Sequence, residues 1–297
     1  MDLIYITTHL NTHQKCIKYL EEQRWNGAPC CPYCQSKKSS PKGLRHTCLG
    51  CSNSYSVTVG TVFEDSNLPL YKWFMAIALI LSAKKGISSM QLSRDLSVNK
   101  NTAWLLQMKI RKAMKQDDDL VLNGIVEADE TFVGGKINRQ FPRKKNQPKK
   151  PRGQEHLKPV FAMVQRQGSV IAQVLNKASR EEIVPIIKTR VTASSVLVSD
   201  ASYIYFPIKE YFKSHEVMSR GAKVFRRGIY HKNTIEGFFS QFKRAIIGQY
   251  HKICEGHLHL YVDELCFKYN HRNTPDKGYN DLLKRLLKDD DCQKLGN

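Results

Sequence analysis

The hydrophobic pattern of the chain changes character near residue 124. Residues 66–116 carry apolar side chains at helical spacing, whereas short apolar runs separated by turn residues follow from Gly124 onward. These runs predict the order β-β-β-α-β-α-β-α, which is typical of an α/β fold with one central sheet. The strands are expected at 125–129, 160–164, 170–175, 196–198 and 216–218, and the helices at 179–187, 205–212 and from 233.

The helical part of the pattern predicts a helix-turn-helix. Two short helices, 87–96 and one beginning near residue 100, are separated by a tight turn around Val98–Lys100. In such a motif the second helix enters the major groove of DNA, so Lys100 and Lys109 are candidate DNA contacts. A helical packing module without DNA contact is the alternative.

Paired cysteines indicate a metal site in the N-terminal region. Cys31-Pro-Tyr-Cys34 and Cys48-Leu-Gly-Cys51 are two CxxC pairs separated by thirteen residues. Each pair can reach one ion from a tight turn, and two such turns complete a tetrahedral zinc site. Because cysteine fills all four positions, the Zn²⁺ is expected to be structural and to fold a small ribbon. Cys30 and His46 are substitute ligands that fit the paired turns less well.

The charge of the chain favours a polyanion as its partner. The sequence has 47 Lys and Arg against 27 Asp and Glu, a formal net charge of +20. The segment Lys136–Lys158 predicts a mobile basic loop for nucleic-acid contact, with a solubilising insertion as the alternative. Its candidate contacts are Arg143, Lys144 and Lys145.

The sequence predicts neither a signal peptide nor a membrane span. The N-terminus lacks a basic start and an apolar core. The longest apolar run, Trp73–Leu81, is much shorter than the ~20 residues that cross a bilayer, so it predicts a buried helix. Nine cysteines in this setting favour reduced thiols and metal ligation, and a cytoplasmic protein is expected.

Three acidic residues far apart in the sequence form the candidate catalytic site. Asp129 and Asp200 each end a predicted strand, and Glu236 lies on the helix that begins near Asn233. Carboxylates brought together could hold two Mg²⁺ or Mn²⁺ ions for phosphoryl transfer. Turn residues and a capping glutamate are the structural alternatives. Glu127, Glu130 and Asp263 are substitute ligands.

Basic residues surround the last of these acids. Lys243 follows Glu236 by about two helical turns, so both face the same side, and Lys243 could hold a substrate phosphate. Arg226, Arg227 and Arg244 add candidate DNA contacts nearby, with a solvated basic face as the alternative.

Several of these strings together resemble a known family. They are the two CxxC pairs, Thr58–Phe63, Val126–Lys136, Val198–Asp200, His231–Arg244 and Gly248–His251. Over residues 15–275 the chain resembles the DDE transposases of bacterial insertion sequences, in the group related to Merlin elements.

The resemblance implies a ribonuclease-H-like catalytic domain behind a zinc ribbon. It implies Asp129 and Asp200 as paired Mg²⁺ or Mn²⁺ ligands with Glu236 as the third. Some relatives have Asn in the third place, so Asn233 is the alternative, although a carboxylate binds a hard cation better. The implied domains are 1–62 (zinc ribbon with helical lead-in), 63–118 (helical DNA-binding segment), 119–280 (catalytic domain) and 281–297 (C-terminal tail).

The expected function is transposition. The protein would bind the terminal inverted repeats of its own element, cleave there and transfer the strand into target DNA, as a homodimer or larger assembly at the bacterial nucleoid. A metal-dependent nuclease without strand transfer is one alternative. A zinc-ribbon transcription regulator, in which the acids are merely structural, is the other.

Overall fold

The computed structural model describes residues 1–134, 157–219 and 226–288. Its contacts divide the chain into two compact units. The first unit joins Met1–Met114 to His271–Asn297, and the second is Lys115–Asn270. Each unit is described by itself below.

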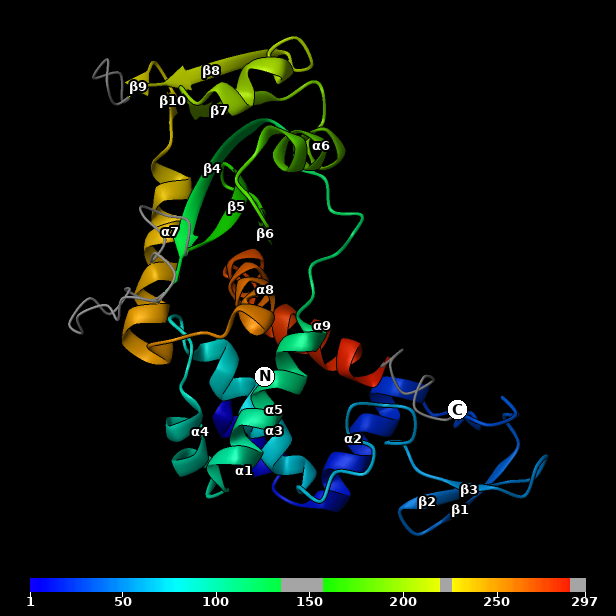
Figure 1. Ribbon diagram of the computed structural model, residues 1–297. Coiled ribbons are helices and arrows are strands. Elements are labelled where there is room, and N and C mark those ends of the chain that lie inside the picture. Colours follow the sequence, from blue (N-terminus) through cyan, green and yellow to red (C-terminus); the bar gives the residue numbers. More distant parts are fainter. Residues whose placement is uncertain (135–156, 220–225, 289–297) are drawn as a thin grey trace, which may run out of the picture. The chain divides into compact units, whose positions relative to one another are not determined.

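The first unit is mostly helical (Figure 1). Side-chain oxygens of Asp2, Thr12, Ser88 and Asn99 accept backbone N–H groups at four of the helix starts, which is why those helices begin there. The helices are α1 (Leu3–His9), α2 (His13–Trp25), α3 (Leu70–Ser82), α4 (Ser89–Leu96), α5 (Lys100–Ala113) and α9 (Pro275–Leu287).

Helix α3 forms the centre of this unit. The apolar run at 73–81 was predicted to be a buried helix, which is confirmed: Trp73, Phe74, Ile77 and Ile80 are at most 2% exposed. Among the described residues, no helix is long and apolar enough to cross a membrane.

The C-terminal helix α9 corrects one expected boundary. Residues from 281 were expected to form a tail, but 281–287 belong to α9, which contacts α2, α3 and α5. Tyr279, Leu282, Leu283 and Leu286 are buried, and the N–H of Val62 donates to the carbonyl of Leu286 at 3.2 Å. Apolar residues at helical spacing along 279–287 explain why this segment packs into the unit.

A small three-stranded antiparallel sheet carries the cysteines. Its strands β1 (Ser39–Lys42), β2 (Arg45–Cys48) and β3 (Ser54–Tyr55) pair in sequence order. The guanidinium of Arg24 in α2 donates to the carbonyls of Val57 and Val59, both at 2.7 Å, and so ties the helical lead-in to the segment after β3. The core here is small, centred on Tyr55 and two of the cysteines.

The second unit is built on a five-stranded sheet. Its order is β6-β5-β4-β7-β8, in which β4, β5 and β6 are antiparallel and β4, β7 and β8 are parallel. This is the strand order of a ribonuclease-H-like fold, as expected. The strands are β4 (Ile125–Val133), β5 (Lys158–Gln165), β6 (Val170–Val174), β7 (Val196–Asp200) and β8 (Ser214–Met218).

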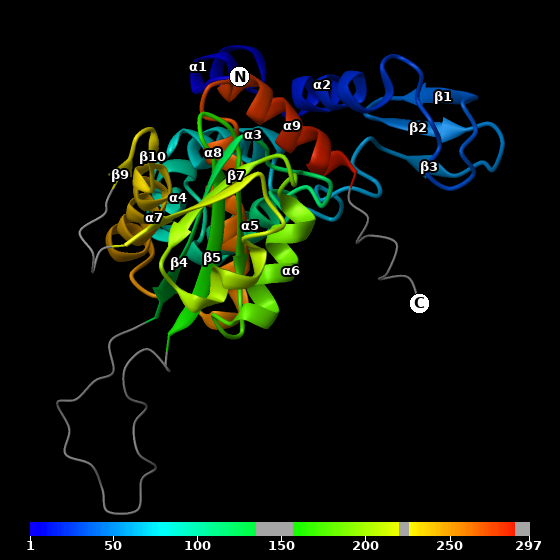
Figure 2. The same cartoon turned by 90° about the horizontal axis from the view of Figure 1, so that it is seen from above.

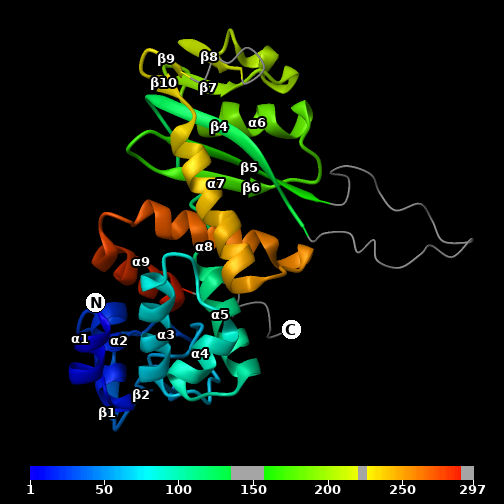
Figure 3. The same cartoon turned by 90° about the vertical axis from the view of Figure 1, so that its left-hand side faces the viewer.

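Helices cover both faces of this sheet (Figures 2 and 3). One face packs against α6 (Arg180–Arg190) and the 3₁₀ helix η1 (Tyr203–Ile208). The other packs against α7 (Asn233–Ala245) and α8 (Leu258–Asn270). Both cores are apolar. Packing of the helices on the two faces therefore fixes the sheet that carries the polar side chains of the site.

Some details differ from the predicted elements. The helix expected at 205–212 is the shorter 3₁₀ helix η1, which contains Pro207; proline cannot donate to a helical ladder. Two strands of two residues each, β9 (Arg226–Arg227) and β10 (Tyr230–His231), precede α7 and were not predicted. A π-helical turn, η2 (Ile246–Tyr250), follows α7, and a 3₁₀ turn, η3 (Glu255–His257), precedes α8.

Candidate active site

The sheet register brings Asp129 and Asp200 level with each other. Strands β4 and β7 run parallel, and Glu127 pairs with Val198. Two residues further along each strand lie Asp129 and Asp200, at the carboxyl end of β7. The backbone register of two neighbouring parallel strands therefore places both carboxylates at one edge.

A third carboxylate joins them. Oxygens of Asp129, Glu130 and Asp200 lie within 4.8 Å of one another. Neighbouring groups hold each: Lys232 Nζ lies 3.0 Å from Asp129 Oδ2, and the N–H of Ser202 donates to Asp200 Oδ1 at 3.0 Å. The hydroxyl of Tyr205 donates to Glu130 Oε1 at 2.7 Å.

Burial and mutual repulsion make this cluster a strong cation site. Burial, together with the charges of Asp200 and Asp129, raises the pKa of Glu130 to about 7. Burial also raises the pKa of Asp129, against the lowering effect of Lys232. Since the oxygens of the three acids lie within 4.8 Å of one another, a divalent cation would relieve their repulsion, and the donor set suits Mg²⁺ or Mn²⁺.

Helix α7 forms the opposite wall. Its residues Ile235, Phe238 and Phe242 pack into the sheet, so positions at the complementary helical spacing face outward. These outward residues line a pocket of ≈ 850 Å³ together with the three acids. They are Asn233, Glu236, Ser240, Lys243, Arg244 and, on the π-helical turn, Ile247.

The start of α7 is fixed by Glu127, which is fully buried. Its carboxylate accepts the backbone N–H groups of Thr234 at 2.9 Å and Ile235 at 3.0 Å, and the Thr234 hydroxyl at 2.8 Å. Arg166 pairs with the same carboxylate at 2.8 Å. A carboxylate at the positive end of a helix dipole is stabilising, so Glu127 acts as a helix cap supplied by a neighbouring strand.

The three substitute acidic ligands, Glu127, Glu130 and Asp263, have different surroundings. Glu130 belongs to the cluster with Asp129 and Asp200, whereas Glu127 is engaged in capping α7. Asp263 lines a separate pocket of ≈ 190 Å³, where Oδ1 accepts the Gln116 side-chain amide at 2.8 Å.

The predicted catalytic residues lie together, and the predicted DNA contacts are dispersed. Asp129, Asp200, Glu236 and Asn233 line the same pocket, as do Lys243 and Arg244. Arg226 and Arg227 lie on β9 and are exposed. The predicted contacts Arg143, Lys144 and Lys145 lie outside the described residues. The roles of all these side chains stay predictions.

Sequence reasoning gave no role to three neighbours of the acids. Tyr205 and Ser202 hydrogen-bond to acids of the cluster, and Ser240 lines the pocket. Ser240 had a usable signal, because it lies one helical turn after Glu236. Tyr205 had none, since its contact with Glu130 spans 75 residues.

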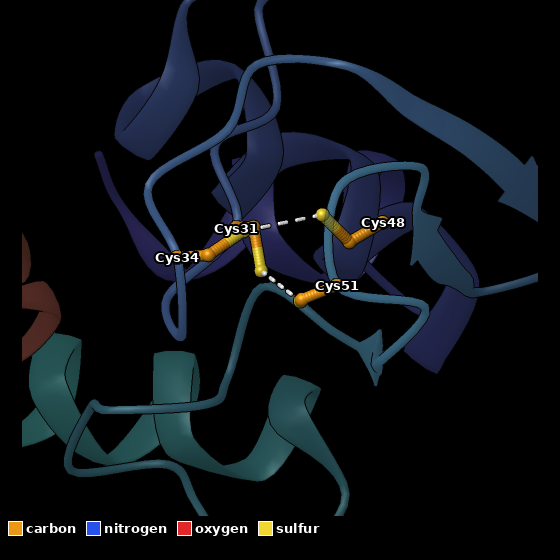
Figure 4. Close-up of side chains that lie close together, drawn as sticks. All are labelled: Cys31, Cys34, Cys48 and Cys51. Atoms are coloured by element: carbon orange, nitrogen blue, oxygen red, sulfur yellow. Dashed lines mark hydrogen bonds between the residues drawn. The ribbon is translucent and has the colours of Figure 1, made fainter.

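The four cysteines converge as the CxxC spacing predicted (Figure 4). The sulfurs of Cys31 and Cys51 are 3.7 Å apart, and those of Cys34 and Cys48 are 3.4 Å apart. Tetrahedral Zn²⁺ with Zn–S of about 2.3 Å places its sulfurs about 3.8 Å apart. The two observed sulfur–sulfur distances are close to this value. Backbone N–H groups of Cys51 and Gly50 lower the pKa of Cys48 to about 6, which favours the thiolate that binds metal.

The alternative zinc ligands are engaged elsewhere. His46 Nε2 lies 2.8 Å from Glu21 Oε1, and the ring stacks on Tyr55. The thiol of Cys30 points to the carbonyl of Gln35 at 3.4 Å. The group of four cysteines that can share an ion includes neither residue.

Helices α4 and α5 are joined by a short turn, which the predicted helix-turn-helix requires. Ser97 adopts a left-handed conformation with φ 50°, which ends α4, and Asn99 caps α5 three residues after Leu96. Lys100 and Lys109 on α5 are both exposed. Their contact with DNA stays a prediction.

Comparison with known proteins gives a family match that coincides with the second unit. The model of the ISXO2-like transposase domain matches residues 121–270. A Halobacterium salinarum protein described as an uncharacterized protein in transposable element ISH50 is 25% identical over 249 residues, which cover 78% of this chain and 83% of that protein.

Solved structures are more distant. The Mos1 strand transfer complex is 12% identical and has a TM-score of 0.32, covering 72% of this chain and 75% of that one. The Mos1 mariner paired end complex with Mn has the same identity and coverage and a TM-score of 0.31.

Proposed function

The chain belongs to the family of ISXO2-like transposases, and from this premise we propose that it cuts and joins DNA at the ends of an insertion sequence. It binds the terminal inverted repeats of its element and hydrolyses one phosphodiester bond at each end, which exposes a 3′-OH. That hydroxyl then attacks a phosphodiester of target DNA, so one strand bond forms as another breaks. Both steps are metal-dependent phosphoryl transfers.

The observation that carries this proposal is the convergence of acids from separate strands and a helix on one pocket. Asp129, Glu130 and Asp200 form the cluster, and Glu236 lines the same ≈ 850 Å³ pocket. Carboxylates gathered beside an open pocket suit a metal-dependent reaction on a bound substrate. The basic Lys243 and Arg244 in the pocket wall suit a phosphate substrate.

Each side chain then has a part in the reaction. Asp129 and Asp200 would hold Mg²⁺ or Mn²⁺, as the paired ligands that the family pattern implies. Ions held there would activate the attacking oxygen and stabilise the leaving oxygen. Lys243 and Arg244 orient the scissile phosphate by charge, and Glu127 keeps α7 in place against β4.

Glu236 is proposed as the third ligand, with Asn233 as the alternative. Both line the pocket from the first turn of α7 and differ by one helical turn. A carboxylate binds a hard divalent cation more strongly than an amide oxygen does. Glu130 adds a fourth acid whose proton would be displaced when the cation binds.

The DNA contacts are proposed on both units. Lys100 and Lys109 on α5 would read or position the terminal repeat in the major groove, and Arg226 and Arg227 would bind phosphates beside the acids. The zinc ribbon is proposed as a structural support for DNA recognition. Both ends of the element must be held together, so a homodimer or larger assembly on double-stranded DNA, located at the bacterial nucleoid, completes the proposal.

Two alternatives make different predictions. A transcription regulator with a zinc ribbon would bind DNA without cutting it, and the transposase family match disfavours it. A nuclease would nick but would not join a pre-cut 3′ end to target DNA, so a strand-transfer assay separates it from a transposase.

The decisive experiment uses purified protein, labelled element ends and Mg²⁺ or Mn²⁺. We expect nicking by the parent and a loss of at least about a hundredfold in Asp200→Ala, because removal of a ligand weakens metal binding at least as much as loss of an outer hydrogen bond. Asp119→Ala is the matched control, since Asp119 is an exposed aspartate of the same unit. Equal nicking by the parent and Asp200→Ala would overturn the assignment of the site.

A further inference from the structure

The hairpin Arg226–His231 stands immediately before α7 and contributes little to the core. Strands β9 and β10 pair Arg227 with Tyr230 and Arg226 with His231, so the loop is Gly228–Ile229. Gly228 has φ 55°, as two-residue hairpin loops require. Arg226, Arg227 and Ile229 are exposed, Ile229 to 59%.

A ribbon this short is marginal by itself, but Arg166 holds the backbone of its loop and of its last residue. Arg166, just after β5, donates from Nη1 to the carbonyl of Ile229 at 2.6 Å and from Nη2 to the carbonyl of His231 at 3.2 Å. The same guanidinium donates to Glu127 through Nε at 3.2 Å and Nη2 at 2.8 Å. One buried carboxylate thus fixes both the hairpin and the start of α7.

The buried pair between Arg166 and Glu127 is a weak source of stability. A buried ion pair loses much of its attraction to desolvation, and this one fixes the backbone of the hairpin beside the start of α7. The surface that it holds in place carries two arginines and an exposed apolar residue, Ile229. This composition suits an external partner, because neither feature is buried in the described part of the chain.

We propose that the hairpin Arg226–His231 is a DNA-contacting ribbon, with Ile229 as an apolar contact in a groove of the element end. The inference rests on the proposed function. A two-stranded ribbon fits the major groove, apolar side chains contact base edges or wedge between base steps, and arginines pair with phosphate. The formal charge of +20 favours DNA over a second copy of this basic chain as the occupant.

The chain between the hairpin and the acids limits where the contact falls. Lys232 follows the hairpin directly, and its Nζ lies 3.0 Å from Asp129 Oδ2. The backbone from Lys232 to Ile229 spans at most three extended residues, or about 10 Å, to which the length of the Lys232 side chain is added. Ile229 therefore contacts DNA among the first few base pairs beside the cut.

The test is a double-mutant cycle between protein and DNA. End binding is measured by fluorescence anisotropy for the parent and Ile229→Ala, with each of the first six base pairs beside the cut replaced in turn. We expect Ile229→Ala to weaken end binding about fivefold. Base changes in the pairs nearest the cut should lower the affinity of the parent more than that of the variant. Val121→Ala, an apolar residue of the same unit that is 44% exposed, is the matched control.

The role of Arg166 is tested separately with Arg166→Lys, which keeps the charge but not the planar fork of donors. We expect base changes near the cut to lower the affinity of Arg166→Lys less than that of the parent, as for Ile229→Ala. The circular dichroism spectrum should stay unchanged. Arg190→Lys is its control, because Arg190 also bridges to backbone carbonyls, those of Asp117 and Leu120, away from the hairpin.

Two results would overturn the inference. One is the absence of coupling at all six base pairs in Ile229→Ala. The other is a parent that sediments as a dimer without DNA and an Ile229→Ala variant that sediments as a monomer, which would make the tip a protein interface. Nicking by the parent is scored in the same samples. If the parent does not nick at all, the proposed function fails; if it nicks without coupling, only the hairpin inference fails.

Discussion

The two metal sites of this protein are assembled in different ways. The cysteine site draws all its ligands from Cys31–Cys51, two tight turns and a small sheet. The acidic site needs strands β4 and β7 to pair in register before Asp129 and Asp200 meet, and α7 to dock before Glu236 joins the pocket. A local site is encoded by spacing, whereas a dispersed site is encoded by the fold.

The difference also concerns what each site does for folding. The ribbon core consists of two cysteines and Tyr55 with three partly buried neighbours, so the metal replaces a hydrophobic core. The acidic cluster lies at the edge of a sheet that is covered by apolar residues on both faces. We therefore expect metal removal to unfold the ribbon and to leave the second unit folded.

The largest effect is expected from Cys48→Ser. Structural zinc in small domains contributes about 10 kcal/mol or more to folding, so the variant should lose zinc and hydrogen-exchange protection across β1–β3. Protection in the second unit should stay as in the parent. Zinc content is measured by atomic absorption and protection by mass spectrometry.

Cys30→Ser is the matched control, because Cys30 is the adjacent cysteine and its thiol points to a backbone carbonyl. We expect one zinc per chain in this variant. Zinc loss in Cys30→Ser, or full zinc in Cys48→Ser, would contradict the assignment of four ligands.

The second-largest effect is expected at the acidic site, which depends on contacts between residues far apart in the sequence. Glu127→Gln keeps the shape of the side chain but removes its negative charge. That charge pairs with Arg166 and accepts the N–H groups of Thr234 and Ile235 in α7. We expect a loss of about 3 kcal/mol in the stability of the second unit. The amides of Thr234 and Ile235 should exchange faster, and the Mn²⁺ concentration for half-maximal nicking should rise.

Glu210→Gln, an exposed glutamate of the same unit, is the control for the charge change. If Glu127→Gln lowered stability while the exchange of Thr234 and Ile235 and the metal requirement stayed at parental values, Glu127 would be a structural residue without influence on the site.

The contrast between local and dispersed encoding explains how much the sequence predicted. All four cysteines were identified, since a CxxC turn is complete within four residues. The five sheet strands were found from their apolar runs, and β4 continues to Val133 beyond the expected end at 129 because it goes on pairing with β5. Strands of two residues, such as β9 and β10, have no periodicity to detect.

The acids show the limit of sequence reasoning more sharply. Asp129 and Asp200 could be proposed because both end apolar runs that become parallel strands. Nothing in the pattern distinguished Glu130, which enters the cluster, from Glu127, which caps a helix 107 residues away. Glu127 and Asp129 alternate onto the same face of β4, yet only Glu127 meets the start of α7, so its role depends on where that helix docks.

The third effect separates Glu236 from Asn233. If Glu236 is the third ligand, Glu236→Gln should lower apparent Mn²⁺ affinity about tenfold to a hundredfold, and Asn233→Ala should change it less than about threefold. The thermal unfolding temperature is followed as Mn²⁺ is added in the absence of DNA, so the result does not depend on nicking. The reverse order of the two variants would make Asn233 the ligand.

The smallest effect is expected from Asp263→Asn, and it tests whether burial alone makes an acid part of the site. Burial raises the pKa of Asp263 above its usual range, against the hydrogen bond from Gln116. A raised pKa in the folded state means that the stability from this group is complete below the unfolded pKa and is lost as pH rises through the folded value. The parent should therefore lose stability relative to Asp263→Asn as the pH rises above about 4, and the two should converge under more acidic conditions. Thermal unfolding across that range measures the difference, and nicking should stay within about twofold of the parent. A strong loss of nicking in Asp263→Asn would mean that acids outside the pocket also serve the reaction, and the separation between the dispersed site and the rest of the unit would fail.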